Sequence, residues 1–292
     1  MTNRAPIEVS VIIPFKNAAP YLRDQLTALA AQELDRAWEV VAADDSSDDE
    51  SRAIALEFRG RLNIDVVTVR GGGGAARACN IGARKAGGTK LIFVDADDEV
   101  APGYLAAMTE ALDTFDFVTS GFDHRVLNPT WVWGAHGPAW RDVEDPIPPM
   151  FGFLPFTGGS IGVNRQTFEA AGGFPEEFRY ALDIGFSWNV QLSGADLHHV
   201  PGAVYRVRYR TSLWGLYRQG RRWGTELPLV YRRYRANGMS RRPLRDAAKH
   251  WGRLPVRLAR ARSRSDLAPL AVQAGLLVGR LLGSVRHRVV YL

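Results

Sequence analysis

Cysteine is nearly absent from this sequence of 292 residues, which contains only Cys79. A single thiol excludes an internal disulfide, a zinc site built from paired cysteines and a redox dithiol. It fits a protein that folds in the reducing cytosol. A signal peptide is not expected either, because the first apolar run, residues 9–13, is short and Pro14 follows it directly.

Acidic residues are scarce in the last third of the chain. Residues 201–292 contain 21 Lys or Arg and 3 Asp or Glu, a net charge of +18, whereas residues 1–200 contain 16 basic and 28 acidic residues, a net charge of −12. The two parts therefore favour different partners. The overall composition, 46% apolar and 23% charged, is that of a folded globular protein and excludes wholesale disorder.

An uninterrupted apolar run of membrane-spanning length is also lacking. The most apolar stretch, residues 267–285, is broken by a proline, a glutamine and an arginine, whereas a spanning helix needs about 20 apolar residues. Its glycines, spaced four residues apart, suit close helix packing within one chain or between two copies in a homo-oligomer. The basic helical region around it predicts either attachment to an anionic membrane surface or packing on the acidic part of the protein.

Strand and helix patterns alternate along the first hundred residues. The predicted strands are 9–13, 38–43, 64–69 and 91–94, and the helices between them include 49–59 and 75–85. Asn17 and Pro20 are interpreted as the cap and first-turn residue of the first helix. Repeated β-α units of this length predict an α/β fold, with a mostly parallel sheet covered by helices on both faces.

Acidic clusters follow two of these strands: Asp44-Asp45 and Asp95-x-Asp97-Asp98. Ligands of parallel sheets bind beyond the carboxyl ends of the strands, so both clusters and Pro14 are expected at one edge. Carboxylates this close repel one another unless a cation lies among them, which makes Asp95 and Asp97 candidate ligands of Mg²⁺ or Mn²⁺. The alternative is a solvated loop whose acidic residues favour the start of the next helix.

The order and spacing of these motifs resemble family 2 of the glycosyltransferases, which has the GT-A fold. The matching elements are residues 9–14, 44–48, Asn80 and 93–98, followed by 158–160, 172–177, Asp183 and Gln219-x-x-Arg222-Trp223. The resemblance covers about residues 7–225. It implies a donor half, 1–122, and an acceptor half, 123–225, of one GT-A domain, and it leaves 226–292 as a basic helical extension.

On the donor side the resemblance implies a role for each matching residue. Pro14, Asp44 and Asp45 would contact the base and ribose of a nucleotide-diphosphate sugar, with Arg77 near the donor and a UDP-sugar favoured. Asp95 and Asp97, with Asp98 as a further candidate, would hold a divalent cation, Mn²⁺ or Mg²⁺, that bridges the diphosphate. Residues 71–74, all glycine, predict either a phosphate-binding nest or a flexible loop.

On the acceptor side the resemblance makes Asp183 the general base that takes a hydroxyl proton in an inverting transfer. The family usually has Glu-Asp at this point, and Leu182 replaces the first acidic residue, so acceptor binding is expected to be atypical. Gln219, Arg222 and Trp223 match the family's Q-x-x-R-W element, in which a Trp can stack on a sugar and an Arg can reach diphosphate oxygens. A helix cap at Asp183 and an ordinary amphipathic helix at 219–223 remain alternatives.

The resemblance therefore implies a metal-dependent, inverting glycosyltransferase that acts on a glycan or lipid-linked acceptor in cell-envelope polysaccharide synthesis. It would work in the cytoplasm or peripherally on the inner face of the cell membrane. A sugar nucleotidyltransferase is a second hypothesis, but the residues after the first strand do not supply its Gly-rich phosphate loop. A catalytically silent nucleotide-sugar-binding member is a third. A nucleic-acid-binding protein is disfavoured, because no recognisable binding module accompanies the basic tail.

Overall fold

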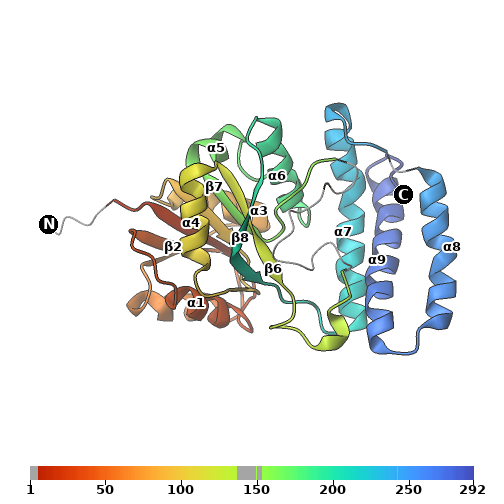
Figure 1. The fold of residues 1–292 in the computed structure, drawn as a ribbon, viewed down its shortest axis with the longest axis horizontal. Helices are drawn as coiled ribbons and strands as arrows, with labels where there is room; N and C mark the ends of the chain where they lie inside the picture. The colour runs from red at the N-terminus through yellow and green to blue at the C-terminus, as the bar shows by residue number, and fades with distance from the viewer. Residues whose placement is uncertain (1–5, 137–148, 150–152, 242) are drawn as a thin grey trace. The chain divides into compact units, whose positions relative to one another are not determined.

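The computed structural model describes residues 6–136, 149, 153–241 and 243–292 (Figure 1). These residues form two compact units: unit 1 comprises residues up to 123 and residues 156–207, and unit 2 the other described residues. The packing thus divides the chain after Val207, whereas the family resemblance set a boundary at 225. A compact unit need not coincide with a functional half, so the boundary at 225 stays a prediction.

Unit 1 contains an eight-stranded sheet in the order β3-β2-β1-β4-β7-β6-β8-β5. The strands are β1 (Val9–Phe15), β2 (Trp38–Asp44), β3 (Ile64–Thr68), β4 (Lys90–Val94), β5 (Glu99–Val100), β6 (Phe117–Asp123), β7 (Ser160–Asn164) and β8 (His198–Arg206). The first four are parallel, with Phe15 opposite Asp44 and Asp44 opposite Thr68, so their carboxyl ends share one edge. β7 runs antiparallel to both β4 and β6. The prediction of a mostly parallel α/β sheet is confirmed.

Helices cover both faces of this sheet. They are α1 (Leu22–Ala30), α2 (Ser51–Glu57), α3 (Ala75–Lys85), α4 (Tyr104–Thr114), α5 (Arg165–Ala170) and α6 (Leu182–Leu192). Ile161 and Val163 of β7 belong to the core cluster formed with α3, α5 and α6, whereas Gly162 between them faces Met108 and Leu112 of α4. This alternation follows from the pleat of the strand, which directs successive residues to opposite faces.

The first helix starts later than predicted. α1 begins at Leu22, and Asn17 lies in the loop before it with a left-handed φ of 52°. The Oδ1 atom of Asn17 accepts a hydrogen bond from the backbone N–H of Asp48 at 3.0 Å. The prediction that Asn17 caps the helix is therefore wrong, because its side chain joins the loop after β1 to the loop after β2.

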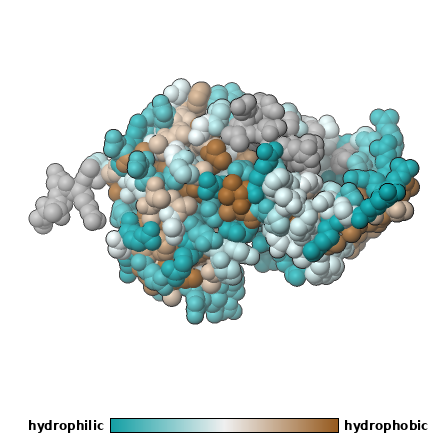
Figure 2. Space-filling view, turned by 60° about the horizontal axis from the view of Figure 1, so that its bottom comes forward, coloured by the Kyte–Doolittle hydropathy of each residue, from teal (hydrophilic) through white to brown (hydrophobic). Residues whose placement is uncertain are grey.

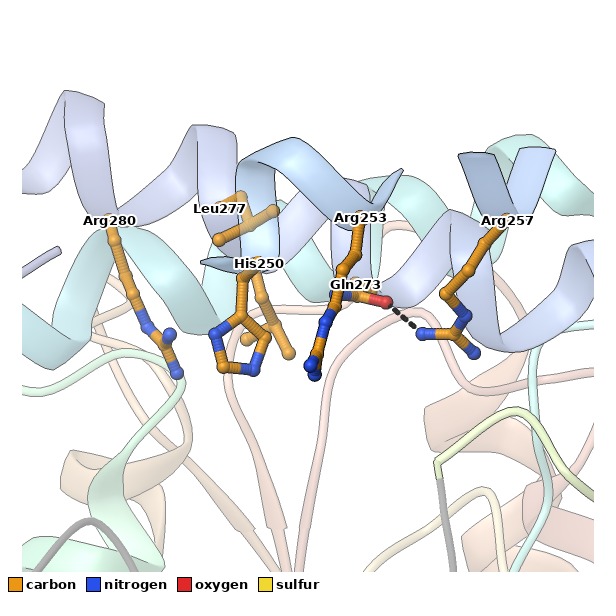
Figure 3. A pocket seen from close by; sticks show the side chains of 7 residues that line it. His250, Arg253, Arg257, Gln273, Leu277 and Arg280 are labelled. Atoms are coloured by element: carbon orange, nitrogen blue, oxygen red, sulfur yellow. Dashed lines mark hydrogen bonds between the residues drawn. The ribbon is translucent and has the colours of Figure 1, made fainter. Parts of the chain in front are cut away.

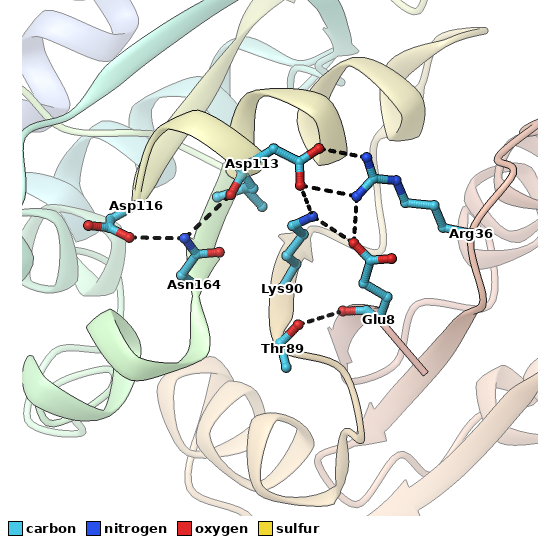
Figure 4. Close-up of polar contacts among 8 residues, drawn as sticks. Glu8, Arg36, Thr89, Lys90, Asp113, Asp116 and Asn164 are labelled. Carbon is cyan, nitrogen blue, oxygen red and sulfur yellow. Dashed lines mark hydrogen bonds and ion pairs between the residues drawn. The ribbon is translucent and has the colours of Figure 1, made fainter. Parts of the chain in front are cut away.

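An ion network closes the amino-terminal edge of the sheet (Figure 4). Lys90, at the start of β4, donates to Glu8 at 2.7 Å and to Asp113, and Arg36 pairs with both carboxylates. Hydrogen bonds from Arg36 and Lys90 hold the pKa of Asp113 at about 2, and those from Lys90 and Arg36 lower the pKa of Glu8. The network lies at the end of the strands opposite to the two acidic clusters.

Unit 2 is built around three long helices that lie side by side, α7 (Leu213–Tyr234), α8 (Leu244–Arg260) and α9 (Arg264–Arg286) (Figure 1). α7 and α9 pack backbone against backbone. A Cβ atom on Gly275, Gly279 or Gly283 would collide with the carbonyl oxygen of Tyr217, Arg221 or Thr225, respectively. The predicted use of the glycine spacing for helix packing is confirmed within one chain.

α9 is long and apolar enough to cross a membrane, judged by length and composition. The sequence analysis predicted that this segment falls short of a membrane-spanning helix, because a proline, a glutamine and an arginine interrupt it. In the structure 44% of its most apolar window is buried inside the protein. A core helix of a protein that never enters a bilayer has the same properties.

Candidate functional site

Asp44 ends β2 and is committed to internal contacts. It is buried, its Oδ1 atom accepts from the N–H of Ser47 at 2.8 Å, and its Oδ2 atom lies 3.7 Å from Arg52. These contacts fix the turn that leaves the sheet. Asp44 therefore shapes the loop, whichever ligand the loop contacts.

Asp45 presents a different arrangement. Its Oδ2 atom accepts from the N–H of Gly74 at 3.1 Å and lies 3.8 Å from Lys16 Nζ. Its Oδ1 atom is buried and has no hydrogen-bond partner among the residues that the structure describes. Buried carboxylate oxygens are almost always satisfied, so an unsatisfied one at a sheet edge is an acceptor for a ligand N–H or O–H.

The glycine loop 71–74 lies beside Asp45. All four glycines have positive φ values, a conformation that favours glycine. A Cβ on Gly72 would lie 3.8 Å from Asp45 Oδ1 and 3.9 Å from Lys16 Nζ, and one on Gly73 would collide with the side chain of Arg77. Asp45, Arg77, Lys16 and the loop thus form one cluster, which we call the glycine-loop cluster. Sequence reasoning missed Lys16, although its place directly after β1 was a signal.

Pro14 lies inside β1, opposite Ala43, and is buried. Its contacts are therefore with the sheet itself, close to the carboxyl ends of β1 and β2.

The second acidic cluster starts directly after β4, where Asp95 is exposed, Asp97 half-buried and Asp98 buried. The backbone of Asp95 is held from two sides. Its N–H donates to the hydroxyl of Tyr205 at 2.7 Å, and its carbonyl oxygen accepts from Nε2 of Gln25 at 2.9 Å. Burial, with Asp98 and Asp95 close by, raises the pKa of Tyr205 well above its ordinary value, so its hydroxyl keeps its proton.

Gln25 spans both ends of this acidic loop. Besides its bond to Asp95, its Oε1 atom accepts from the N–H of Val100 at 3.0 Å, and the side chain is fully buried. Sequence reasoning missed both Gln25 and Tyr205. The signal for Gln25 was a polar residue next to Leu22 and Leu26 on the apolar face of α1.

The carboxylate of Asp95 packs directly against the backbone of Gly159, a contact that we call the Gly159 cradle. A Cβ on Gly159 would lie 2.5 Å from Asp95 Oδ2. No group of three or more His, Cys, Asp or Glu among the described residues is arranged to hold a metal ion. Mg²⁺ and Mn²⁺ take oxygen ligands, and Mg²⁺ typically uses one or two carboxylates plus substrate phosphates. Asp95 and Asp97 fit such a cation when phosphate oxygens complete its shell.

Asp183 lies in the first turn of α6 and is half-buried. One turn further along, Ser187 Oγ accepts from the N–H of Thr157 at 3.1 Å, and Thr157 is followed by Gly158 and Gly159. Residues four apart share a helix face, so Asp183 lies on the face of α6 that packs on this segment. The neighbouring Leu182 packs against the core of unit 1, which gives a physical reason for an apolar residue there.

The side chain of Asn80 makes two hydrogen bonds to the backbone of the segment that leads to α6. Its Nδ2 atom donates to the carbonyl oxygen of Phe174 at 2.9 Å, and its Oδ1 atom accepts from the N–H of Phe174 at 2.8 Å. A Cβ on Gly173 would lie 2.7 Å from the same Oδ1 atom. The motif residues Asn80 and Gly173 are therefore structural.

Gln219, Arg222 and Trp223 lie on α7 in unit 2. The Oε1 atom of Gln219 is buried and has no hydrogen-bond partner within the described part of the chain, and the Trp223 ring lies 5.2 Å from the ring of His136. The His136 ring in turn lies 4.3 Å from that of Tyr209. Burial, with His124 nearby, lowers the pKa of His136 to about 4, so it is neutral at pH 7. Sequence reasoning did not find His136 or Tyr209.

A pocket of about 530 Å³ lies between α8 and α9 (Figure 3). It is lined by His250, Arg253, Arg257, Gln273, Leu276, Leu277 and Arg280. None of the predicted site residues lines it. It is a separate, cationic feature of unit 2.

Comparison with known proteins relates this arrangement to a family. The family model "Glycosyl transferase family 2" matches residues 10–170. The succinoglycan biosynthesis protein ExoU of Rhizobium meliloti is 34% identical over 172 residues, which cover 56% of this chain and 47% of ExoU. The poly(ribitol-phosphate) beta-N-acetylglucosaminyltransferase TarS of Staphylococcus aureus is 33% identical over 96 residues, which cover 32% of this chain and 17% of TarS. The matches thus span less than half of either relative.

Solved structures agree on the fold. The mannosyltransferase PcManGT of Pyrobaculum calidifontis, in complex with GDP-Man and Mn²⁺, aligns with a TM-score of 0.64 at 20% identity over 98% of this chain and 90% of its own. S. aureus TarS in complex with UDP-GlcNAc aligns with a TM-score of 0.53 at 20% identity over 97% and 93%. The predicted GT-A architecture is confirmed, and the chain belongs to glycosyl transferase family 2.

Proposed function

We propose that the protein transfers a sugar from a nucleotide-diphosphate sugar, by preference a UDP-sugar, to a hydroxyl group of a glycan or lipid-linked acceptor. The observation that carries this proposal is the Asp95-x-Asp97 pair at the end of β4, held by Gln25, Tyr205 and the Gly159 cradle. Two exposed or half-buried carboxylates at a sheet edge, with the backbone of Asp95 held by two hydrogen bonds, suit binding of a cation with a diphosphate.

The donor proposal rests on the glycine-loop cluster. The unsatisfied Oδ1 atom of Asp45 can accept from a base N–H or a ribose hydroxyl, and Lys16 and Arg77 supply positive charge for phosphate. TarS binds UDP-GlcNAc and PcManGT binds GDP-Man, so relatives of this fold use either base. We favour uridine because TarS resembles this chain in both sequence and fold.

Asp95 and Asp97 are the proposed metal ligands, with Asp98 as a third candidate. A divalent cation at this place would offset the negative charge that develops on the departing nucleotide diphosphate. The protein's part is to hold the two carboxylates at the sheet edge. The bonds to Gln25 and Tyr205 fix the backbone of Asp95 and do not use its carboxylate oxygens.

Asp183 is the proposed general base of an inverting transfer. Its carboxylate would take the proton of the acceptor hydroxyl as that oxygen bonds to the anomeric carbon and the bond from this carbon to the diphosphate breaks. Gln219, Arg222 and Trp223 are the proposed contacts for acceptor and diphosphate. ExoU and other relatives are named for polysaccharide biosynthesis, which supports a glycan product.

The experiment that tests the proposal is calorimetric titration of the full-length protein with UDP and GDP, with and without Mn²⁺, followed by a donor screen that measures nucleotide release. UDP binding should tighten at least about tenfold with Mn²⁺ in the wild type, and this gain should vanish in Asp97→Ala. The matched control is Asp65→Ala, an exposed aspartate on β3. Metal-independent UDP binding by the wild type would contradict the metal proposal.

Two alternatives give different results in the same assays. A nucleotidyltransferase would release pyrophosphate from a nucleoside triphosphate in the presence of a sugar phosphate. A catalytically silent member would bind the nucleotide sugar and release no nucleotide with any acceptor tried.

A further inference from the structure

We propose that α8 is an interfacial helix that docks the protein on an anionic lipid membrane, with its apolar face in the headgroup region. This inference concerns unit 2 and does not depend on the proposed reaction. It uses the exposed face of one helix, its charge and its packing on α9.

One face of α8 is apolar and the other is mainly basic, with Val256 as an exposed apolar residue among the basic side chains. Leu244, Trp251 and Leu258 recur every seven residues on one face, with Pro255, Ala248 and Ala259 beside them, whereas Arg245, Lys249, Arg253 and Arg257 recur every four residues on the other. The helix carries five Lys or Arg and one Asp. A helix with Trp and Leu on one face and Lys and Arg on the other is the type that lies in a membrane interface.

Packing on α9 covers only part of the apolar face of α8. Ala247 and Leu254 are the buried residues of the helix, and Leu254 packs with Leu270 and Leu277 of α9. Trp251 is 39% exposed, Leu258 46% and Leu244 54%. Contact with α9 therefore occupies one edge of the apolar arc and leaves its centre open to solvent.

α9 extends the same surface. Leu281, Leu282 and Val285 are exposed, Val285 by 75%. Helical periodicity directs Leu282 and Val285 away from Gln273 and Arg280, which line the pocket. Figure 3 shows His250, Arg253, Arg257 and Arg280 pointing together to one side of the helix pair, where they line the pocket. In Figure 2 the surface formed by these helices carries brown side chains beside teal ones.

The positive charge around this face favours an anionic membrane over a second copy of the chain as its partner. Residues 241–292 contain 12 Lys or Arg and 2 Asp or Glu. A second copy seated face to face would bring the same cationic flanks together, and this repulsion opposes a dimer. An anionic membrane attracts them, and each Lys or Arg near such a surface contributes roughly a fivefold gain in affinity.

The test is co-sedimentation of the full-length protein with vesicles of equal parts phosphatidylglycerol and phosphatidylcholine at low salt, compared with vesicles of phosphatidylcholine alone. Binding should require the anionic lipid and should fall steeply at high salt, which screens exposed charges. The double variant Trp251→Ser/Leu258→Ser should bind at least about tenfold more weakly. Arg245→Gln/Lys249→Gln should weaken binding by about fivefold per charge removed.

Matched controls come from unit 1. Leu192→Ser removes an apolar residue of similar exposure, 44%, at the end of α6, and Arg84→Gln/Lys85→Gln removes two exposed charges of α3. Neither should alter vesicle binding. UDP titration in Mn²⁺ should be the same for the wild type and every α8 variant, which separates this proposal from the proposed reaction.

Any of three results would overturn the proposal. The first is wild-type protein that stays in solution with anionic vesicles at low salt, and the second is α8 variants that sediment as the wild type does. The third is a wild-type dimer in sedimentation velocity that the Trp251→Ser/Leu258→Ser variant loses while vesicles remain free of protein. In that case the face joins two copies of the chain.

Discussion

Gln25 and Asp95 are joined by a hydrogen bond of 2.9 Å between a side-chain amide on α1 and the backbone carbonyl at the end of β4. The same amide group accepts from Val100 N–H, five residues further on. One buried side chain therefore sets the span of the loop that carries Asp95, Asp97 and Asp98. A motif defined by its carboxylates depends here on a residue 70 positions away.

Gln25→Met should loosen this loop. The variant removes the hydrogen bonds that Gln25 makes to the carbonyl of Asp95 and to the N–H of Val100, at a cost of about 1–3 kcal/mol each in unfolding free energy. Metal-dependent UDP binding should weaken by about tenfold. The control is Gln32→Met, because Gln32 bonds Ala101 O and Leu105 N–H at the far end of the loop. Equal loss of metal-dependent binding in both variants would show that Gln25 stabilises the fold without positioning the carboxylates.

Gly159→Ala should displace the carboxylate of Asp95. The added methyl group would lie 2.5 Å from Oδ2, a distance that forces one of the two groups to move. We expect the Mn²⁺-dependent gain in UDP affinity to fall at least about tenfold, measured by calorimetry, with little change in metal-free binding. Gly60→Ala is the matched control, since nothing lies within 4 Å of a Cβ there. If Gly159→Ala keeps the full Mn²⁺-dependent gain in UDP affinity, the space beside Gly159 does not position Asp95 for metal binding.

Asp183→Asn should separate chemistry from donor binding. The amide cannot accept the acceptor proton, so turnover should fall by on the order of a hundredfold or more while UDP affinity stays near wild type. Asp196→Asn, at an exposed aspartate after α6, should keep full turnover. A parallel loss of UDP affinity would assign Asp183 to the donor side instead.

Acid should weaken the fold through the ion network at the amino-terminal edge. The pKa of Asp113 is about 2 and that of Glu8 is lowered, so both carboxylates stabilise the folded state above their unfolded pKa values, near 4, and this stability is lost as the pH falls toward 2. Lys90→Met should lower the unfolding free energy by about 1–3 kcal/mol at pH 7. It should also flatten the pH dependence between 4 and 2. Lys85→Met, at an exposed lysine, should do neither; urea titrations across this pH range provide the measurement.

Much of the fold was accessible from the sequence because β1 to β4 and the helices between them follow simple periodic patterns. The acidic residues after β2 and β4 predicted a shared edge because parallel strands end together. The sequence analysis did not predict β6 and β7. β7 runs antiparallel to its neighbours and pairs with β4 and β6, which are distant from it in sequence. Asn17 was misassigned because a side chain that can cap a helix can equally bind another loop.

The candidate site was predictable only in its charged residues. Asp45 and Arg77 stood out by type and position, whereas Tyr205 acts on Asp95 through a hydroxyl group 110 residues away. No local pattern encodes such a contact. The same holds for Asn80, whose partner, Phe174, follows 94 residues later.

The backbone contact between α7 and α9 ties the Q-x-x-R-W element to the last helix of the chain. Gly220 and Gly224 flank Arg221, Arg222 and Trp223, and both glycines touch α9 through its main chain. In a shortened protein that ends before Arg264, the backbone of α7 at Gly220 and Gly224 would be exposed to water. Removing the basic tail to obtain a better-behaved sample would thus disturb α7 itself, and an inactive truncated protein would say nothing about membranes or charge.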